Sequence, residues 1–152
     1  MPKRNPAIEK IERNHSIFVD SGAWIALFSS RDQHHEDADR VFRKIVASKR
    51  LLLTSNLILA EIHRLLLFGA GSKAALAALA KIEASSLVRI VYANAKNHQS
   101  AKEWLQKLSD QDISYTDAVS FSMMEDAACR EALSYDHHFR VAGFEIRTAA
   151  GR

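Results

Sequence analysis

The sequence predicts a single three-layer α/β domain, in which a central parallel β-sheet is covered by helices on both faces. Five short apolar segments are typical of buried strands. Longer segments with a helical spacing of apolar residues separate most of them, and this alternation favours parallel pairing through right-handed crossovers. No repeat, low-complexity tract or linker divides the 152 residues.

The predicted strands are short and rich in aliphatic residues. "SIFV" and "RLLLTS" are compact apolar segments, and "LVRIVYA" has the β-branched content of a strand. The predicted strands are residues 16–19, 50–55, 87–93, 131–135 and 144–148.

Helical patterns lie between these strands. In residues 36–49, apolar side chains at spacings of 3, 1, 3 and 1 form the stripe of an amphipathic helix. Ser55 or Asn56 is a candidate N-cap for the next helix, which we expect Gly69 to end. Other helices are predicted soon after the first strand, at residues 72–85 and 94–110, and at 114–129 with Ser114 or Thr116 at its start.

Composition favours a folded protein of the reducing cytoplasm. Hydrophobic residues make up 47% and charged residues 26%, a balance typical of globular domains. The single cysteine, Cys129, excludes an internal disulfide. We expect no signal peptide and no membrane span, because no apolar run reaches the roughly 18 to 20 residues that cross a bilayer. Residues 1–15 are predicted to form an N-terminal arm, and residues 16–150 the domain.

Four acidic residues from separate segments are predicted to meet at one edge of the sheet. Asp20 follows the first strand and Asp136 follows the fourth, so both lie at carboxyl ends of strands, where α/β sheets collect ligands. Glu61 lies in the helix after the second strand, and Asp117 starts the helix before the fourth. Two carboxylates about 4 Å apart repel by roughly 4 kcal/mol at an effective dielectric near 20, so a divalent metal or protons must relieve them.

Carboxylate ligands completed by water suit hard cations such as Mg²⁺ or Mn²⁺. Phosphodiester hydrolysis uses such an ion to polarise a phosphoryl oxygen, activate water and steady the leaving oxygen. Each acid also has an ordinary explanation, because a lone surface carboxylate is usually solvated and Asp117 suits a helix N-terminus. Apolar sequence surrounds Asp20 and Glu61, which favours a functional role for these two.

Four segments, in order, resemble the PIN-domain family and specifically its VapC-type toxin ribonucleases. They are "FVDSGAWIALF", "TSNLILAEI", "DISYTDAVSFSMM" and "ALSYDHHFRVAGFEI", and they span roughly residues 16 to 148. The resemblance implies a PIN-like sheet with an acidic pocket for Mg²⁺ or Mn²⁺, where activated water hydrolyses RNA. Matched motif by motif, the catalytic and metal-ligating residues would be Asp20, Glu61, Asp117 and Asp136.

The resemblance also implies partners: an RNA substrate, a second copy in a homodimer, and a cognate antitoxin whose tail enters the pocket. The apolar segment "LLLFGAGSKAALAALAKI" is a candidate dimer face. Many family members carry a serine, threonine or asparagine two residues after the first aspartate, where this chain has Gly22. Ser21 or Thr116 is a candidate to supply the missing hydroxyl behind the metal ligands.

The basic, histidine and aromatic residues give weaker evidence for RNA or metal binding than the four acids do. The net charge of +3 is compatible with RNA, and Arg64 and Arg140 are candidate phosphate contacts, although scattered basic residues are more often simply solvated. The adjacent histidines at 34–35 and 137–138 are not expected to be metal ligands, because neighbours in sequence rarely chelate one ion together. Trp24 is expected to pack in the core rather than to stack on bases.

The leading hypothesis is a metal-dependent endoribonuclease that acts as the toxin of a type II toxin–antitoxin pair. Two alternatives remain: a stand-alone PIN-type RNA-processing nuclease without an antitoxin, and a non-catalytic α/β module that binds metal or RNA. A nucleotide-binding domain is disfavoured, because no glycine-rich phosphate loop follows a predicted strand.

Overall fold

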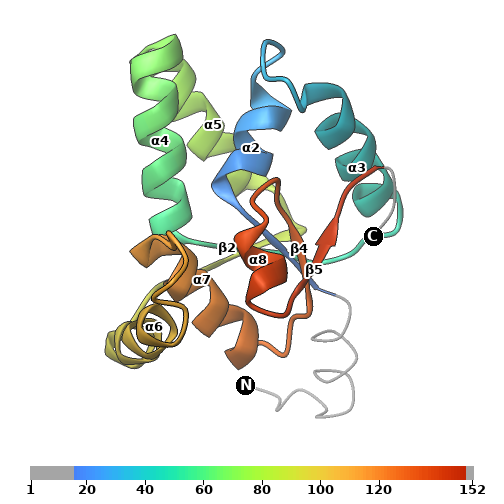
Figure 1. Ribbon diagram of the computed structural model, residues 1–152. Coiled ribbons are helices and arrows are strands. Elements are labelled where there is room, and N and C mark those ends of the chain that lie inside the picture. The colour runs from blue at the N-terminus through green and yellow to red at the C-terminus, as the bar shows by residue number, and fades with distance from the viewer. Residues whose placement is uncertain (1–15, 150–152) are drawn as a thin grey trace, which may run out of the picture.

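A computed structural model describes residues 16–149 as a five-stranded parallel sheet with helices on both sides (Figure 1). The strands are β1 (Ile17–Val19), β2 (Leu52–Ser55), β3 (Val88–Val91), β4 (Glu131–Leu133) and β5 (Glu145–Arg147). The helices are α2 (Ser21–Phe28), α3 (His35–Ala47), α4 (Asn56–Ala70), α5 (Ser72–Ala84), α6 (Ala95–Lys107), α7 (Tyr115–Asp126) and α8 (His138–Val141). The predicted arm, residues 1–15, lies outside the described residues, as do residues 150–152.

The sheet confirms the predicted fold class. Its strand order is β3-β2-β1-β4-β5, and every neighbouring pair is parallel. Strand β1 is central, and Ile17 pairs with Leu52 of β2 on one side and Glu131 of β4 on the other. All three residues of β1 are at most 1% exposed. The carboxyl end of β1 is therefore enclosed by the rest of the domain.

Helices cover the sheet in two layers. In Figure 1, α2 to α5 lie toward the top of the view, and α6 and α7 lie toward the bottom. The main hydrophobic core joins the sheet to α2–α5 and to the inner side of α7, where Phe121 packs edge-on against Phe139 at 5.1 Å between ring centroids. A smaller apolar cluster lies mainly between α6 and α7 and includes Ala101, Ala118 and Met123.

Most predicted element boundaries lie within three residues of the observed ones, and two other differences are more informative. Gly69 was expected to end the helix that follows β2, but α4 continues to Ala70 and ends at Gly71, whose φ of 90° suits a glycine. The short helix α8 was not predicted, because four residues are too few to show a helical period. Ser55 caps α4 through a hydrogen bond from the Ile58 amide, which confirms one of the two predicted caps.

Among residues 16–149, no helix has both the length and the apolar composition needed to cross a membrane.

Candidate active site

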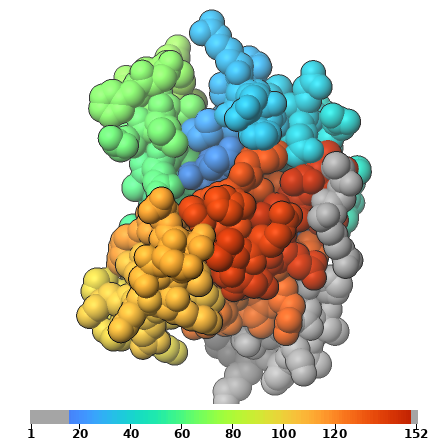
Figure 2. All heavy atoms as spheres, viewed as in Figure 1, coloured from blue at the N-terminus to red at the C-terminus, as the bar shows by residue number. Residues whose placement is uncertain are grey.

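Asp20 lies where the central strand β1 passes into helix α2. Its amide donates to the Leu133 carbonyl of β4 at 3.1 Å, which continues the pairing of the two strands. Its carboxylate Oδ1 accepts from the Ser21 amide at 2.8 Å, so Asp20 is the N-cap of α2. Only 7% of the residue is exposed. In Figure 2 the blue start of α2 is visible between green α4 and the orange-to-red C-terminal elements.

Asp117 belongs to the first turn of α7. Ser114, the N-cap, accepts from the Asp117 amide at 3.1 Å, and the Asp117 carboxylate accepts from the Ser114 amide at 3.1 Å. This reciprocal capping box fixes the carboxylate at the positive end of the helix. The structure confirms the prediction that the helix starts at Ser114. Asp117 has a structural role in this capping box, and the same carboxylate can also take part in catalysis.

Asp136 follows β4 in a short turn before α8. Its Oδ1 accepts from the His138 amide at 2.9 Å and lies 3.0 Å from His138 Nδ1. The His137 ring lies further away, at 3.8 Å, and its side chain is 71% exposed. His138 therefore orients the Asp136 carboxylate from within the same turn.

Ser134 joins two of the acids. Its hydroxyl donates to Asp20 Oδ2 at 3.0 Å and accepts from the Asp136 amide at 3.0 Å. Ser134 is fully buried. A single hydroxyl thus lies between the acid that follows β1 and the acid that follows β4.

Electrostatics shows that the four acids are neighbours. The pKa of Asp20 is raised to about 7, chiefly because burial removes the water that would solvate its charge, and the charges of Asp117 and Glu61 add to this effect. The hydrogen bonds from Ser21 and Ser134 act in the opposite direction. Burial also raises the pKa of Asp117, with the charges of Asp136 and Glu61 contributing. Each predicted acid therefore acts on at least one other.

The four carboxylates do not form one tight cluster of ligand atoms among the described residues. Among residues 16–149, the group of three acidic, histidine or cysteine side chains that brings its ligand atoms within 4.8 Å is Asp136, His137 and His138. The four acids are not gathered that tightly, which is the arrangement that mutual repulsion favours. The Asp136 group comes from consecutive residues, and the Nδ1 atom of His138 already faces Asp136. We therefore assign His138 to positioning Asp136 rather than to metal ligation.

The donor set fits a hard divalent cation. Every atom offered by the four acids is a carboxylate oxygen, the ligand that Mg²⁺ and Mn²⁺ prefer. The hydrogen bonds that Asp20 accepts leave lone pairs on both of its oxygens, since each carboxylate oxygen has two. A cation would also relieve the repulsion that raises the pKa values of Asp20 and Asp117.

The other predicted site residues lie around this edge in different roles. Ser21 contacts Asp20 through its backbone amide, and the described contacts show no bond from its hydroxyl. The Thr116 carbonyl accepts from the Ser120 hydroxyl at 2.8 Å. Arg64 on α4 and Arg140 on α8 are exposed and available to solvent-borne ligands.

Ser134 and His138 were not among the predicted site residues. The signal for Ser134 was present as "SYD", in which a hydroxyl precedes the acid by two residues. Its contact with Asp20 depends on the pairing of β4 with β1, and this pairing is not visible in a local pattern.

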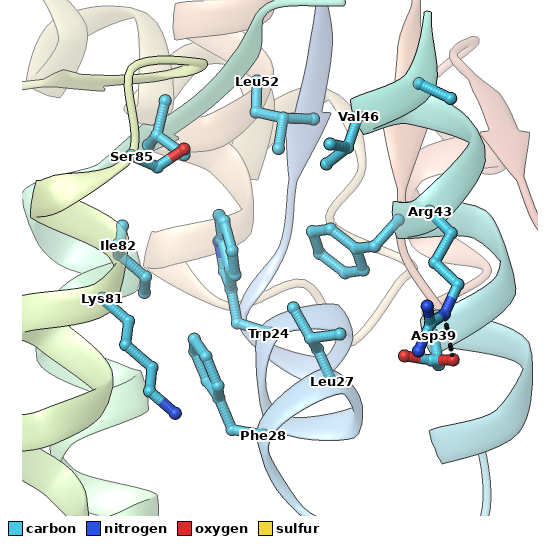
Figure 3. A pocket seen from close by; sticks show the side chains of 13 residues that line it. Trp24, Leu27, Phe28, Asp39, Arg43, Val46, Leu52, Lys81, Ile82 and Ser85 are labelled. Carbon is cyan, nitrogen blue, oxygen red and sulfur yellow. Dashed lines mark hydrogen bonds and ion pairs between the residues drawn. The ribbon is translucent and has the colours of Figure 1, made fainter. Parts of the chain in front are cut away.

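An apolar groove lies away from the four acids. It has a volume of about 590 Å³ and is lined by residues of α2, α3, α5, β2 and β3. Figure 3 shows Trp24, Leu27 and Phe28 of α2 between α5 and α3, with Lys81 on the α5 side. Trp24 is buried as predicted, but its Nε1–H has no hydrogen-bond partner among the described residues. A buried donor without an acceptor is costly.

Comparison with known proteins decides the family. A model of the PIN domain matches residues 17–145. The chain belongs to the PIN domain family. It is 38% identical over 133 residues to the 23S rRNA-specific endonuclease VapC20 of Mycobacterium tuberculosis, covering 86% of this chain and 98% of the relative.

Solved PIN domain structures agree with the fold. The crystal structure of Mycobacterium tuberculosis VapC20, described as a sarcin–ricin loop cleaving toxin, matches with a TM-score of 0.74 and 36% identity. The match covers 84% of this chain and 95% of that one. A structure of VapBC2 from Rickettsia felis, bound to a promoter DNA fragment, matches with a TM-score of 0.66 at 12% identity over 87% of this chain and 97% of that one. This second similarity shows the shared PIN fold.

The raised pKa of Asp20 predicts how stability depends on pH without metal. The folded protein holds the Asp20 proton up to about pH 7, whereas an aspartate side chain in water has a pKa near 3.8. The free energy of unfolding should therefore fall as pH rises from about 4 to 7, by about 1.4 kcal/mol per unit of pKa difference. Denaturant unfolding in EDTA buffers across this range measures the slope.

Asp20→Asn should flatten this slope. Asp39→Asn should keep it, because Arg43 lowers the pKa of the exposed Asp39 and places its titration below this window. An unchanged slope in Asp20→Asn would contradict the assignment.

Proposed function

We propose that this PIN domain protein is a metal-dependent endoribonuclease of the VapC type, acting in the cytoplasm. The observation that carries the proposal is the set of acids from four separate segments at one end of the sheet, where the charges of the others add to the raised pKa values of Asp20 and Asp117. The proposed catalytic and metal-ligating residues are Asp20, Glu61, Asp117 and Asp136. Similarity to a 23S rRNA-specific endonuclease supports ribosomal RNA as the substrate class.

The chain's own residues perform two tasks in this reaction: the acids present negative charge, and the arginines hold the RNA. Asp20 and Asp117 present negative charge at the starts of α2 and α7, where the helix dipoles help to keep them ionised. A bound Mg²⁺ or Mn²⁺ supplies Lewis-acid activation of water and of a phosphoryl oxygen. Arg64 and Arg140 are proposed to hold RNA phosphates on either side of the acids. Water adds its oxygen to phosphorus, the P–O bond to the leaving nucleotide breaks, and a proton passes to the leaving oxygen.

Replacing an acid should remove RNA cleavage without unfolding the protein. Loss of a residue behind a metal ligand typically lowers metal affinity or activity 10- to 100-fold, so loss of a ligand in Asp20→Asn or Asp117→Asn should exceed about 100-fold. The measurement is cleavage of a sarcin–ricin loop RNA in Mn²⁺ buffer, resolved on a gel. The exposed Asp110 provides a matched control, and Asp110→Asn should cleave at the rate of the unaltered protein. Full activity in Asp20→Asn would remove the active-site assignment.

We also propose that the apolar groove binds an antitoxin. A toxin requires a neutralising partner, and a similar structure is described as a toxin. The groove offers an apolar lining and the Lys81 ammonium for an acidic residue. It therefore suits an apolar peptide segment that carries a carboxylate.

A charge placed in the groove should weaken the antitoxin complex. Val46 lines the groove and is 53% exposed, so Val46→Glu should lower affinity at least about 10-fold by placing an unpaired carboxylate in an apolar contact. RNA cleavage should be unchanged. Calorimetry with the protein encoded by the adjacent small gene measures the affinity. Val141→Glu, the same change at an exposed valine of α8, is the control, and equal affinities for the two variants would exclude the groove.

A homodimer is the third part of the proposal. Leu65 and Phe68 of α4 and Leu76 of α5 are 51%, 80% and 66% exposed, and α4 packs along α5. Apolar side chains gathered at one end of a helix pair favour burial against a second copy.

Sedimentation equilibrium should give a mass twice that of the 17.0 kDa chain. Phe68→Glu should shift the mass to that of the monomer, whereas Val46→Glu on α3 should remain dimeric. A monomer of the unaltered protein at micromolar concentration would refute the dimer.

A further inference from the structure

The hydroxyl of Ser134 occupies an unusual position between two acids. It donates its hydrogen to Asp20 Oδ2 and accepts the amide hydrogen of Asp136, with both distances at 3.0 Å. Asp20 and Ser134 are 114 residues apart, and the contact forms because β1 and β4 pair in parallel with Val19 opposite Leu133. Ser134 is the first residue after β4, as Asp20 is the first residue after β1.

The Ser134 hydroxyl donates to a side-chain carboxylate rather than to a backbone carbonyl. A buried serine commonly donates to a nearby backbone carbonyl, as Ser120 does to the Thr116 carbonyl at 2.8 Å in α7. Ser134 instead donates to Asp20, and its oxygen holds the turn that carries Asp136. A charge-assisted hydrogen bond of this kind restricts rotation of the carboxylate more than a neutral one does.

The hydrogen bonds of Asp20 leave its carboxylate oriented but open. Oδ1 accepts from the Ser21 amide and Oδ2 accepts from Ser134, so both oxygens are held in place while each keeps a lone pair. Removal of the Ser134 hydroxyl would free Oδ2 and leave the Asp136 amide without its acceptor. Both acids would then lose a restraint at once.

We propose that Ser134 is a positioning residue that sets the spacing of Asp20 and Asp136, so that both carboxylates face one divalent cation. This inference rests on the proposed nuclease function and deepens it. Ser134 acts through the two acids and does not touch the RNA.

The test is the affinity for Mn²⁺, measured by electron paramagnetic resonance of the free ion, together with cleavage of a sarcin–ricin loop RNA. Ser134→Ala should weaken Mn²⁺ binding about 10- to 100-fold, as loss of an orienting residue typically does. Ser134→Thr keeps the hydroxyl and should bind within about 3-fold of the unaltered protein. At fixed subsaturating Mn²⁺, Ser134→Ala should lower kcat and leave the KM for RNA unchanged.

Ser122 provides the matched control. It is 2% exposed and accepts from Asn97 Nδ2 at 3.1 Å, away from the four acids. Ser122→Ala therefore removes a buried hydroxyl and should leave Mn²⁺ affinity unchanged. Thermal unfolding in EDTA establishes that each variant is folded before the ion is added.

Two results would overturn the inference. Unaltered Mn²⁺ affinity in Ser134→Ala would show that the hydroxyl does not position the acids, and equal losses in Ser134→Ala and Ser134→Thr would show that the hydroxyl is not the cause. These outcomes differ from failure of the proposed function, in which the unaltered protein would bind no Mn²⁺ and cleave no RNA.

Discussion

The constraint on which the site depends is the buried carboxylate of Asp20 at the end of the central strand. Strand β1 has a neighbour on each side, so a charge at its end is largely removed from water. The Ser21 amide, the Ser134 hydroxyl and the N-terminus of α2 offset part of that cost. Its pKa nevertheless rises to about 7, chiefly because burial removes the water that would solvate the charge, and the charges of Asp117 and Glu61 add to the rise. A cation is the remaining means of holding this group ionised.

Helix α2 connects the two surfaces of the protein. Its N-cap, Asp20, belongs to the acidic site, and Trp24, one turn later, lines the apolar groove. The helix has eight residues and packs against both α3 and α4. The proposed catalytic site and the proposed partner groove therefore lie one turn apart along one short helix, and a partner in the groove would lie against the helix that Asp20 begins.

Several features were predictable because they depend on local patterns. The strand and helix order followed from apolar periodicity, and Ser55 and Ser114 were recognisable caps. Gly69 was a misleading signal, because a glycine near the end of a helix suggests a terminus, whereas Gly71 is the residue with the positive φ. Helix α8 has no visible period in four residues. Ser134, whose hydroxyl contacts Asp20 in the structure, was not among the predicted site residues, because the contact depends on the pairing of β4 with β1.

The sequence by itself determined which acids follow which strands, and a parallel sheet places the ends of its strands at one edge whatever the details of packing. Only the tertiary structure decided how deeply Asp20 is buried, which hydroxyl it contacts, and that the Trp24 indole N–H is buried without a partner among the described residues. The physical reason is that desolvation and hydrogen bonding sum over all neighbours in space. For Asp20 the decisive neighbours come from β4, α4 and α7, which lie far away along the chain.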